Sequence, residues 1–246
     1  IEDLRFGVQP KYPLLVSIFQ KSLDSISIEE KNKLANKWIG SIKERGNQHI
    51  ELNESETAYL DNKVIKYCID PNWLPFEGLN EKGEHTGMSS DYYKLFKKIL
   101  SAKFELVKTK SWSQSFEYIK QKKCDILTLS METPERKKYL NFIDSYLEIP
   151  LVIVNKTDDA FINEMSDLKG KKIGITKDYG YVETLKKKYQ FLDIAEINNI
   201  DVGLNKIKEG KLFAYIDALA AIGHEFQTKY FGELKIAGQL SEKLDF

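Results

Sequence analysis

One arginine near the middle of the chain follows a polar turn, a combination suited to binding a small anion. Thr133 and Pro134 are typical of a helix start, with Thr133 as the cap and Pro134 in the first turn, and Arg136 comes directly after them. A guanidinium presents a planar fork of donors that matches a carboxylate bidentately. We therefore predict that Arg136 binds an anion together with Ser130, Met131 and Thr133. The alternative is an arginine in a surface ion pair.

Composition limits the classes of protein to which the chain can belong. Its 246 residues are 42% hydrophobic, enough to bury the core of one or two compact units. Acidic and basic residues number 37 each and are interspersed, so we expect no nucleic-acid partner. No apolar run approaches the roughly 20 residues of a membrane helix, and the first residue, Ile1, suggests a segment excised from a longer, membrane-anchored parent.

Cysteine and histidine are too scarce to suggest a metal site or a disulfide framework. The histidines, at positions 49, 85 and 224, show no ligand spacing, so we predict neither a metal nor a cofactor. Cys68 lies in an expected strand and Cys124 at the start of another. Two buried free thiols are the favoured interpretation, although a bridge is conceivable if these strands are neighbours.

The period of the apolar residues predicts an alternation of strands and helices. Such alternation favours parallel pairing with right-handed crossovers, and a second alternation after residue 150 indicates a second lobe. We expect helices at 28–45, 53–60, 91–100, 113–122, 181–189, 202–209 and 218–226, a helical turn at 168–170, and strands at 64–69, 104–108, 125–129, 151–154, 172–176, 193–197 and 213–216. The fold class is therefore α/β, with two lobes, each a mixed, mainly parallel sheet flanked by helices.

The expected boundaries follow from this alternation. Residues 1–55 form an N-terminal strand, helix and linker helix, 56–149 lobe one and 150–217 lobe two, and 218–246 return to lobe one. Crossings near Glu148–Leu151 and Asp217–Ala221 would act as a hinge beside a ligand cleft, because ligands bind at the carboxyl ends of parallel strands.

Several segments, in the right order, resemble family 3 extracellular solute-binding proteins. They are the T-P-x-R run ending at Arg136 with the following F-x-x-x-Y, the D-P-N-W-L-P-F-E stretch Asp70–Glu77, Gly87 with Asp91, Ser111–Ser113, and Asp167–Gly174. Ser145 replaces the usual proline before the tyrosine. The resemblance covers about residues 54–238 and implies a periplasmic-binding-protein-like fold of type II, a Venus flytrap.

The resemblance also implies roles for particular residues. Arg136 would grip the α-carboxylate of an amino acid, backbone amides at the Gly180 turn would meet it from the other lobe, and Asp217 would pair with the ammonium. Asp217 has an alternative role as a helix cap. Glu132 would select a ligand with an extra positive charge or point to solvent. Trp73, Phe76, Trp112, Tyr179 and Tyr181 would form aromatic walls, the alternative being that they belong to the core.

The first residues resemble the end of one such domain in a tandem receptor. We expect Leu4–Leu23 to supply a strand and a helix to lobe one, from the same chain or, through residues 1–25, from a tandem domain or a second copy. This organisation is similar to the periplasmic part of a membrane sensor, either a histidine kinase of a two-component system or a diguanylate cyclase.

The implied function is reversible binding without catalysis. Three alternatives remain open. The first is an enzyme resembling cyclohexadienyl dehydratase, with Glu77 or Glu132 as the general acid. The second is a signalling module that binds no ligand, and the third is a free carrier of the transport type.

Overall fold

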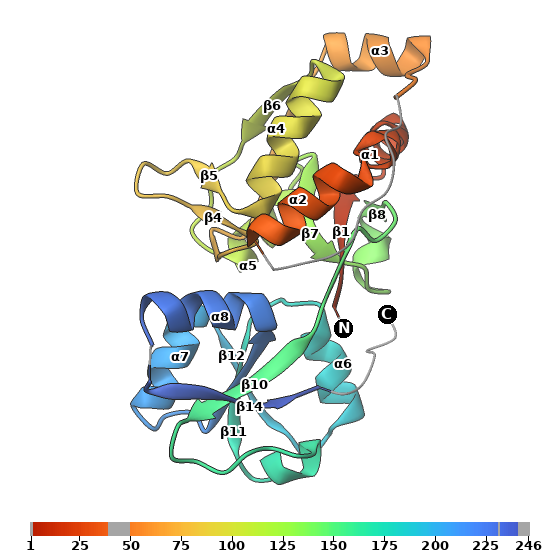
Figure 1. Ribbon diagram of the computed structural model, residues 1–246. Coiled ribbons are helices and arrows are strands. Elements are labelled where there is room, and N and C mark those ends of the chain that lie inside the picture. Colours follow the sequence, from red (N-terminus) through yellow and green to blue (C-terminus); the bar gives the residue numbers. More distant parts are fainter. Residues whose placement is uncertain (1, 39–49, 231, 241–246) are drawn as a thin grey trace. The chain divides into compact units, whose positions relative to one another are not determined.

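The computed structural model describes residues 2–38, 50–230 and 232–240 and divides into two compact units (Figure 1). The first lobe comprises Leu4–Lys110 and Gln114–Tyr146. The second lobe comprises Leu147–Phe246 together with the short segments Ile1–Asp3 and Ser111–Ser113. The two-lobed α/β fold predicted from the sequence is confirmed, and each lobe is described below by itself.

The first lobe is built on a mixed sheet with the strand order β6-β2-β7-β1-β8, and β9 also pairs with β1. β2 is parallel to β6 and β7, whereas β1 is antiparallel to β7 and β8. The strands of this sheet are β1 (Glu2–Val8), β2 (Val64–Cys68), β6 (Lys103–Leu106), β7 (Ile126–Met131) and β8 (Asn141–Phe142), whereas β9 (Leu147–Ile149) falls within the residues of the second lobe.

Helices and a small second sheet complete the first lobe. The helices are α1 (Pro13–Ser25), α2 (Ile28–Trp38), α3 (Glu54–Asp61), α4 (Met88–Leu100), α5 (Trp112–Lys120) and the 3-10 turn η1 (Arg136–Lys138). The start of α5, through Ser113, is grouped with the second lobe. The small sheet consists of β3 (Asn72–Trp73), β4 (Glu77–Leu79) and β5 (His85–Thr86) and was not anticipated from the sequence. The expected continuation of α2 to Arg45 lies outside the described residues.

The N-terminal strand and helix pack into the first lobe of the same chain. β1 lies inside the sheet, between β7 and β8. Its Phe6 is fully buried, and the ring centroid lies 5.6 Å from those of Phe19 in α1 and Phe96 in α4. Tyr146 stacks on the same ring at 5.0 Å. These aromatic contacts fix β1 and α1 to the core.

The second lobe is a mixed sheet with the order β12-β11-β13-β10-β14. β11 is parallel to β12 and β13, and β10 is antiparallel to β13 and β14. The elements are β10 (Leu151–Lys156), η2 (Met165–Leu168), β11 (Lys172–Thr176), α6 (Tyr181–Lys188), β12 (Asp193–Ile197), α7 (Ile200–Lys208), β13 (Ala214–Ala218), α8 (Leu219–Thr228) and β14 (Leu234–Gln239).

The C-terminal part of the chain departs from the expected boundaries. Residues 218–246 were expected to return to lobe one, whereas α8 packs on β10 and β13, and β14 pairs with β10 along Val152–Lys156. β10 is almost entirely buried, so its two backbone edges both need partners, and β14 supplies the second.

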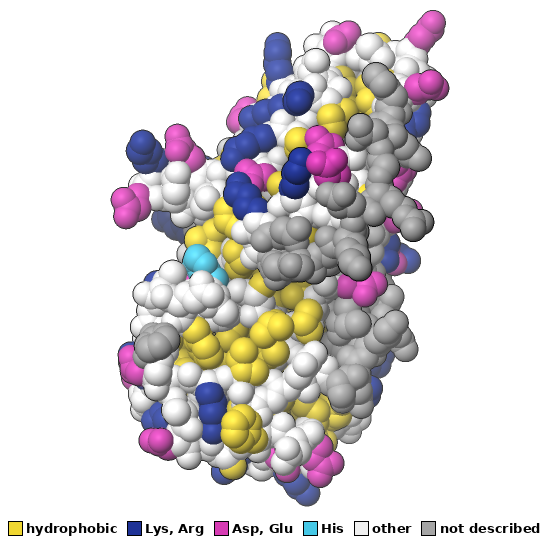
Figure 2. Space-filling model, viewed as in Figure 1, with side chains coloured by type: hydrophobic (Ala, Val, Ile, Leu, Met, Phe, Trp, Pro, Cys, Tyr) yellow, Lys and Arg dark blue, Asp and Glu magenta, His cyan; other side chains and the backbone are white. Residues whose placement is uncertain are grey.

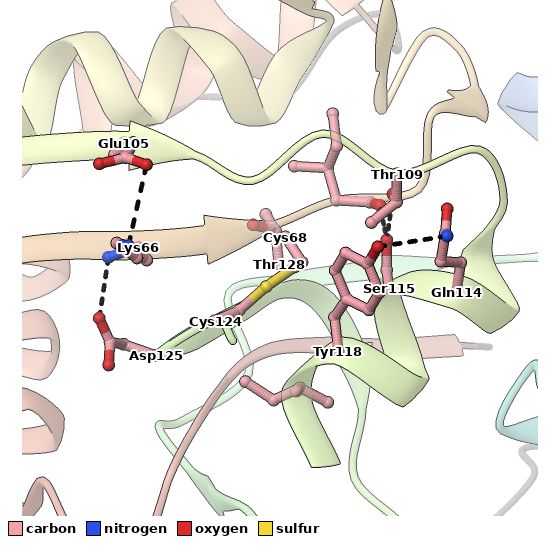
Figure 3. The surroundings of a disulfide bond; sticks show 12 residues. Lys66, Cys68, Glu105, Thr109, Gln114, Ser115, Tyr118, Cys124, Asp125 and Thr128 are labelled. Atoms are coloured by element: carbon pink, nitrogen blue, oxygen red, sulfur yellow. Dashed lines mark hydrogen bonds and ion pairs between the residues drawn. A yellow bond between two sulfur atoms is a disulfide. The ribbon is translucent and has the colours of Figure 1, made fainter. Parts of the chain in front are cut away.

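The two cysteines are joined in a disulfide, so the interpretation as free thiols was wrong (Figure 3). Cys68 ends β2, Cys124 lies just before β7, and these strands are neighbours. Their Cα atoms are 5.9 Å apart, within the range that a bridge needs. The disulfide is fully buried in the first lobe and connects the strands that lead into Asp70–Glu77 and Ser130–Arg136.

Acidic and basic side chains lie side by side on the face shown in Figure 2. Ion pairs also join the helices of the first lobe: Asp91 of α4 pairs with Lys94 of its own helix and with Lys37 of α2. Among the described helices, none combines the length and apolar character needed to cross a membrane.

Candidate functional site

In the first lobe the structure brings together the polar residues of the predicted anion site. One terminal nitrogen of Arg136 donates to the Met131 carbonyl at 2.7 Å and to Ser130 Oγ at 3.2 Å. The backbone N–H of Arg136 donates to Thr133 Oγ1 at 3.2 Å. Ser130 and Met131 end β7, so the sheet itself carries the acceptors that orient the guanidinium.

Arg136 is held on another side by an aromatic ring that sequence reasoning missed. Its guanidinium carbon lies 4.8 Å from the ring centroid of Phe116 in α5, and the residue is only 4% exposed. A surface ion pair therefore does not describe this arginine. In place of the helix expected from Thr133, the structure has the short 3-10 turn η1, which begins at Arg136. Thr133 lies three residues before that turn, and its hydroxyl accepts from the N–H of Arg136.

Glu132 is engaged by cations of its own lobe. Its carboxylate lies 2.5 Å from Lys137 Nζ and 4.0 Å from Arg5 Nε. Glu132 was predicted either to select a ligand cation or to point to solvent. In the structure it pairs with these two cations, so a cationic ligand would compete with Lys137 for the carboxylate.

Trp73 and Phe76, the predicted aromatic walls of the first lobe, form a pair. Their ring centroids are 4.5 Å apart, Trp73 is almost fully buried, and Phe76 is completely so. The two rings come from the Asp70–Glu77 stretch, in which β3 and β4 pair through Asn72 with Gly78 and Trp73 with Glu77.

In the second lobe Asp217 is a fully buried carboxylate on β13. Its Oδ2 accepts from the Tyr215 hydroxyl at 2.9 Å, and its Oδ1 accepts from the N–H of Ala218 at 2.7 Å. The N-cap residue of α8 is Ala218, and no side chain caps this helix. Asp217 is therefore not a conventional helix cap, which was the alternative role predicted for it. The carboxylate instead lies at the end of the strand, where α8 begins.

Tyr215, which orients Asp217, was also missed from the sequence. Its hydroxyl lies 2.5 Å from Thr176 Oγ1. The ring passes close to Gly203 of α7 and Gly174 of β11, where any Cβ would collide with it. Tyr215 and Asp217 are two residues apart on one strand and thus share a face, a spacing that could have revealed the pair.

The predicted Gly180 turn leads into α6. Gly180 is the N-cap and has φ −60°, whereas the left-handed conformation falls on Asp178, with φ 62°. Tyr179 and Tyr181 pack edge to face at 5.7 Å. Trp112, in a segment grouped with this lobe, donates its indole N–H to the Asp178 carbonyl at 3.0 Å and packs edge to face on Tyr179 at 6.2 Å.

Tyr181 is entirely buried, and its hydroxyl donates to the Ile216 carbonyl at 3.3 Å. This environment fits the alternative assignment to the core of the second lobe. Tyr179, 8% exposed, keeps some accessible surface.

Together these features define a class of protein: two α/β lobes, one carrying an oriented arginine and the other a buried aspartate. The model of bacterial extracellular solute-binding proteins, family 3, matches residues 65–232, more than half of the chain. The chain belongs to this family, which confirms the resemblance inferred from the sequence.

Individual relatives include both binding proteins and sensors. The L-cystine-binding protein TcyJ of Escherichia coli K12 is 26% identical over 157 residues, which are 63% of this chain and 59% of TcyJ. The sensor protein EvgS of E. coli O157:H7 is 22% identical over 207 residues, 82% of this chain and 17% of EvgS. The chain therefore spans less than two thirds of either relative.

Among solved structures, the periplasmic VFT2 domain of Bordetella pertussis BvgS superposes with a TM-score of 0.70 at 17% identity. The match covers 78% of this chain and 82% of that domain. At this level of identity it supports the fold alone, and that fold is the Venus flytrap.

Proposed function

We propose that this chain is the ligand-binding domain of an extracytoplasmic sensor and that it binds a small amino acid or a related carboxylate. Arg136 would bind the carboxylate as a bidentate fork, and Asp217 would bind the ammonium group. The observation that carries the proposal is the oriented guanidinium of Arg136, fixed by Ser130, Met131 and Phe116. Such a preformed donor geometry favours binding, because a side chain that is already fixed loses little conformational entropy when the ligand binds.

The remaining predicted site residues supply the surroundings. Thr133, the amides at Gly180 and the rings of Trp73, Phe76, Trp112 and Tyr179 would surround the ligand, with Tyr181 behind them and Glu132 adjusting the local charge. Binding rather than catalysis is favoured by the named functions of the relatives, a cystine-binding protein and a sensor. Glu77, one of the two possible general acids, is fully buried.

We further propose a periplasmic location in a membrane-anchored parent, with a histidine kinase or a diguanylate cyclase as the output. The similarity to EvgS along 82% of this chain supports a sensor over a free carrier. Closure of the lobes transmits a signal only if the ligand prefers the closed state, and contacts from residues of both lobes would supply this preference.

The test is thermal unfolding of the wild type and of Arg136→Ala against a panel of amino acids and small carboxylates. A ligand at about 100 times its dissociation constant adds about 2.7 kcal/mol to the free energy of unfolding. We expect one compound to stabilise the wild type and to have no effect on the variant. Equal stabilisation of both proteins would refute the role of Arg136, and stabilisation by no compound would favour a module that signals without ligand.

A further inference from the structure

A buried carboxyl group connects the Asp70–Phe76 loop to α4. Glu77 Oε1 accepts from the backbone N–H of Asp70 at 2.6 Å, and Oε2 lies 3.1 Å from Ser89 Oγ in the first turn of α4. Glu77 is completely buried, and the hydrogen bonds described for it go to Asp70 and Ser89 rather than to the anion site around Arg136. Glu77 directly follows Phe76, the last residue of the loop, and is hydrogen-bonded to Asp70, the first residue, so it lies at the base of the loop.

The hydrogen bonds continue from Ser89 to His85 of β5 and on to Tyr67 of β2. Ser89 Oγ lies 2.7 Å from Nε2 of His85, whose Nδ1 lies 3.2 Å from the Tyr67 hydroxyl on β2. The Tyr67 ring stacks on Tyr93 of α4 with centroids 3.8 Å apart. Glu77, Ser89, His85 and Tyr67 therefore form one hydrogen-bonded chain, which we name the Glu77 chain.

The loop held by this chain is itself compact. Asp70 Oδ1 accepts from the N–H of Asn72 at 2.9 Å, and the N–H of Phe76 donates to the Trp73 carbonyl at 3.0 Å. Gly87, with φ 98°, lets the backbone of Phe76 pass directly beside it, since a Cβ there would collide with that backbone. The position of Trp73 thus depends on what holds both ends of the loop.

We propose that Glu77 is a positioning residue of the ligand site: through Asp70 and Ser89 it sets the Asp70–Phe76 loop and with it the orientation of Trp73. The proposal rests on the proposed function, in which Trp73 contacts the ligand. Removal of the carboxyl group breaks the attachment of the loop at Asp70 and leaves the anion-binding residues untouched.

The positions of the protons in the Glu77 chain can be observed, and they depend on whether Glu77 is protonated. Burial raises the pKa of Glu77 well above its usual value, and burial lowers the pKa of His85 to about 3, so the imidazole is neutral. A protonated Glu77 donates to Ser89, which then donates to Nε2 of His85 and leaves the ring proton on Nδ1. An ionised Glu77 accepts from Ser89, and the ring proton moves to Nε2 so that it can donate to Ser89.

Other titratable groups face the chain and contribute to its field. They are Asp70 from the loop, Tyr67 from β2, Asp91, Tyr93, Lys94 and Lys97 from α4, and Tyr146 before β9. Substitution of Glu77 alone isolates its contribution, because these groups are the same in each protein compared.

The first measurement is 19F NMR of protein labelled with 5-fluorotryptophan, with each resonance assigned by a Trp→Phe substitution. We expect Glu77→Ala to displace the Trp73 resonance and leave that of Trp38, on α2, in place. Glu77→Gln should restore the wild-type position, since its amide reproduces both hydrogen bonds. An unmoved Trp73 resonance in folded Glu77→Ala would overturn the proposal. If Glu77→Ala does not fold, Ser89→Ala, which removes the hydrogen bond between Ser89 and Glu77, takes its place. The Trp73 resonance is then expected to move in Ser89→Ala, and an unmoved resonance would overturn the proposal.

The second measurement is the 15N NMR tautomer of His85. In Glu77→Gln the new side-chain amide accepts from the N–H of Asp70 through its oxygen, so its nitrogen can only donate to Ser89. This variant should therefore hold the ring proton on Nδ1 at every pH above about 4. A ring proton on Nε2 in this variant would contradict the order of hydrogen bonds in the chain. Both measurements are made without ligand, so they succeed or fail independently of the ligand panel.

Discussion

At the scale of single residues, Arg136 is an oriented cation rather than a flexible one. The carbonyl of Met131 and the hydroxyl of Ser130 accept from one terminal nitrogen, and Phe116 covers the guanidinium plane. Arginine is suited to this environment because the planar group can stack on a ring and still present its fork of donors. A lysine placed there would retain the charge and lose the fork.

This difference leads to a prediction for the ligand found with the panel. Arg136→Lys should weaken binding by about 1.5–3 kcal/mol, roughly 10- to 150-fold, because one of two charge-assisted hydrogen bonds is lost. Arg5→Lys is the matched control, since Arg5 lies in the same lobe and contacts Glu132 and the Ile143 carbonyl. Isothermal titration of both variants measures the effect, and an equal loss in the two would show that Arg136 has no special role.

His85 gives a prediction about pH. Burial lowers the pKa of this imidazole from 6.5 to about 3, so it stabilises the fold above pH 6.5 and loses this contribution as the pH falls toward 3. Between pH 7 and pH 4.5, the wild type should lose about 2–3 kcal/mol more than His85→Asn, which does not titrate. Urea unfolding at a series of pH values measures the difference, and parallel pH profiles would show that His85 is not buried as a neutral ring.

Part of the site follows from local sequence, and part depends on packing between distant elements. Ser130, Thr133 and Arg136 lie within seven positions of one another, so their proximity was foreseeable. Phe116 comes from a different helix, and the Glu77 chain joins residues of β2, β4, β5 and α4. No local pattern in the sequence specifies which of these side chains meet, because the topology of the sheet brings them together.

At the scale of elements, two glycines in helices of the second lobe offer a matched comparison. A Cβ at Gly203 of α7 would overlap the Tyr215 ring, whereas a Cβ at Gly223 of α8 meets nothing within 4 Å. Gly203→Ala should therefore destabilise by about 1–3 kcal/mol, and Gly223→Ala should stabilise by about 0.4–1 kcal/mol. Denaturant unfolding of both variants is the measurement, and stabilisation by both would show that Tyr215 can move away.

The bounds of strands and helices with a clear hydrophobic period were predicted well, but the pairing of the strands was not. β11 and β12 begin and end where the sequence placed them, and α3 (Glu54–Asp61) is shifted by one residue from the expected range 53–60. The alternation of strands and helices, however, does not specify that β14 covers the edge of β10 or that a disulfide joins the end of β2 to the segment just before β7. Pairing depends on contacts distant in sequence, which apolar period does not encode.

β1 provides a prediction about the integrity of the first lobe. Phe6→Ala should cost about 3–5 kcal/mol, because it leaves a cavity among Phe19, Phe96 and Tyr146. Phe161→Ala is the control, since this ring is 64% exposed. Chemical unfolding of the two variants is the measurement. A similar small loss in both would mean that the N-terminal strand is an appended linker rather than a part of the lobe.

At the scale of the whole molecule, each lobe has its own sheet and its own core, so each can unfold as a unit. The Cys68–Cys124 disulfide lies in the first lobe and closes a loop with a sequence separation of 56. The loss of its loop-closure effect should cost that lobe about 4 kcal/mol. In calorimetry, replacement of both cysteines by serine should therefore lower one transition, which identifies it as that of the first lobe.

With the transitions assigned, the ligand tests how the lobes cooperate. In the proposed function the ligand contacts Arg136 in the first lobe and Asp217 in the second, so it would stabilise both lobes and both transitions should rise together as its concentration increases. In Arg136→Ala neither transition should move, because the carboxylate loses its partner and the ammonium contact alone binds too weakly. A rise in the first-lobe transition alone would instead show that the compound binds to that lobe only. Such a ligand would have no reason to prefer the closed state, so it could not signal by closure of the lobes.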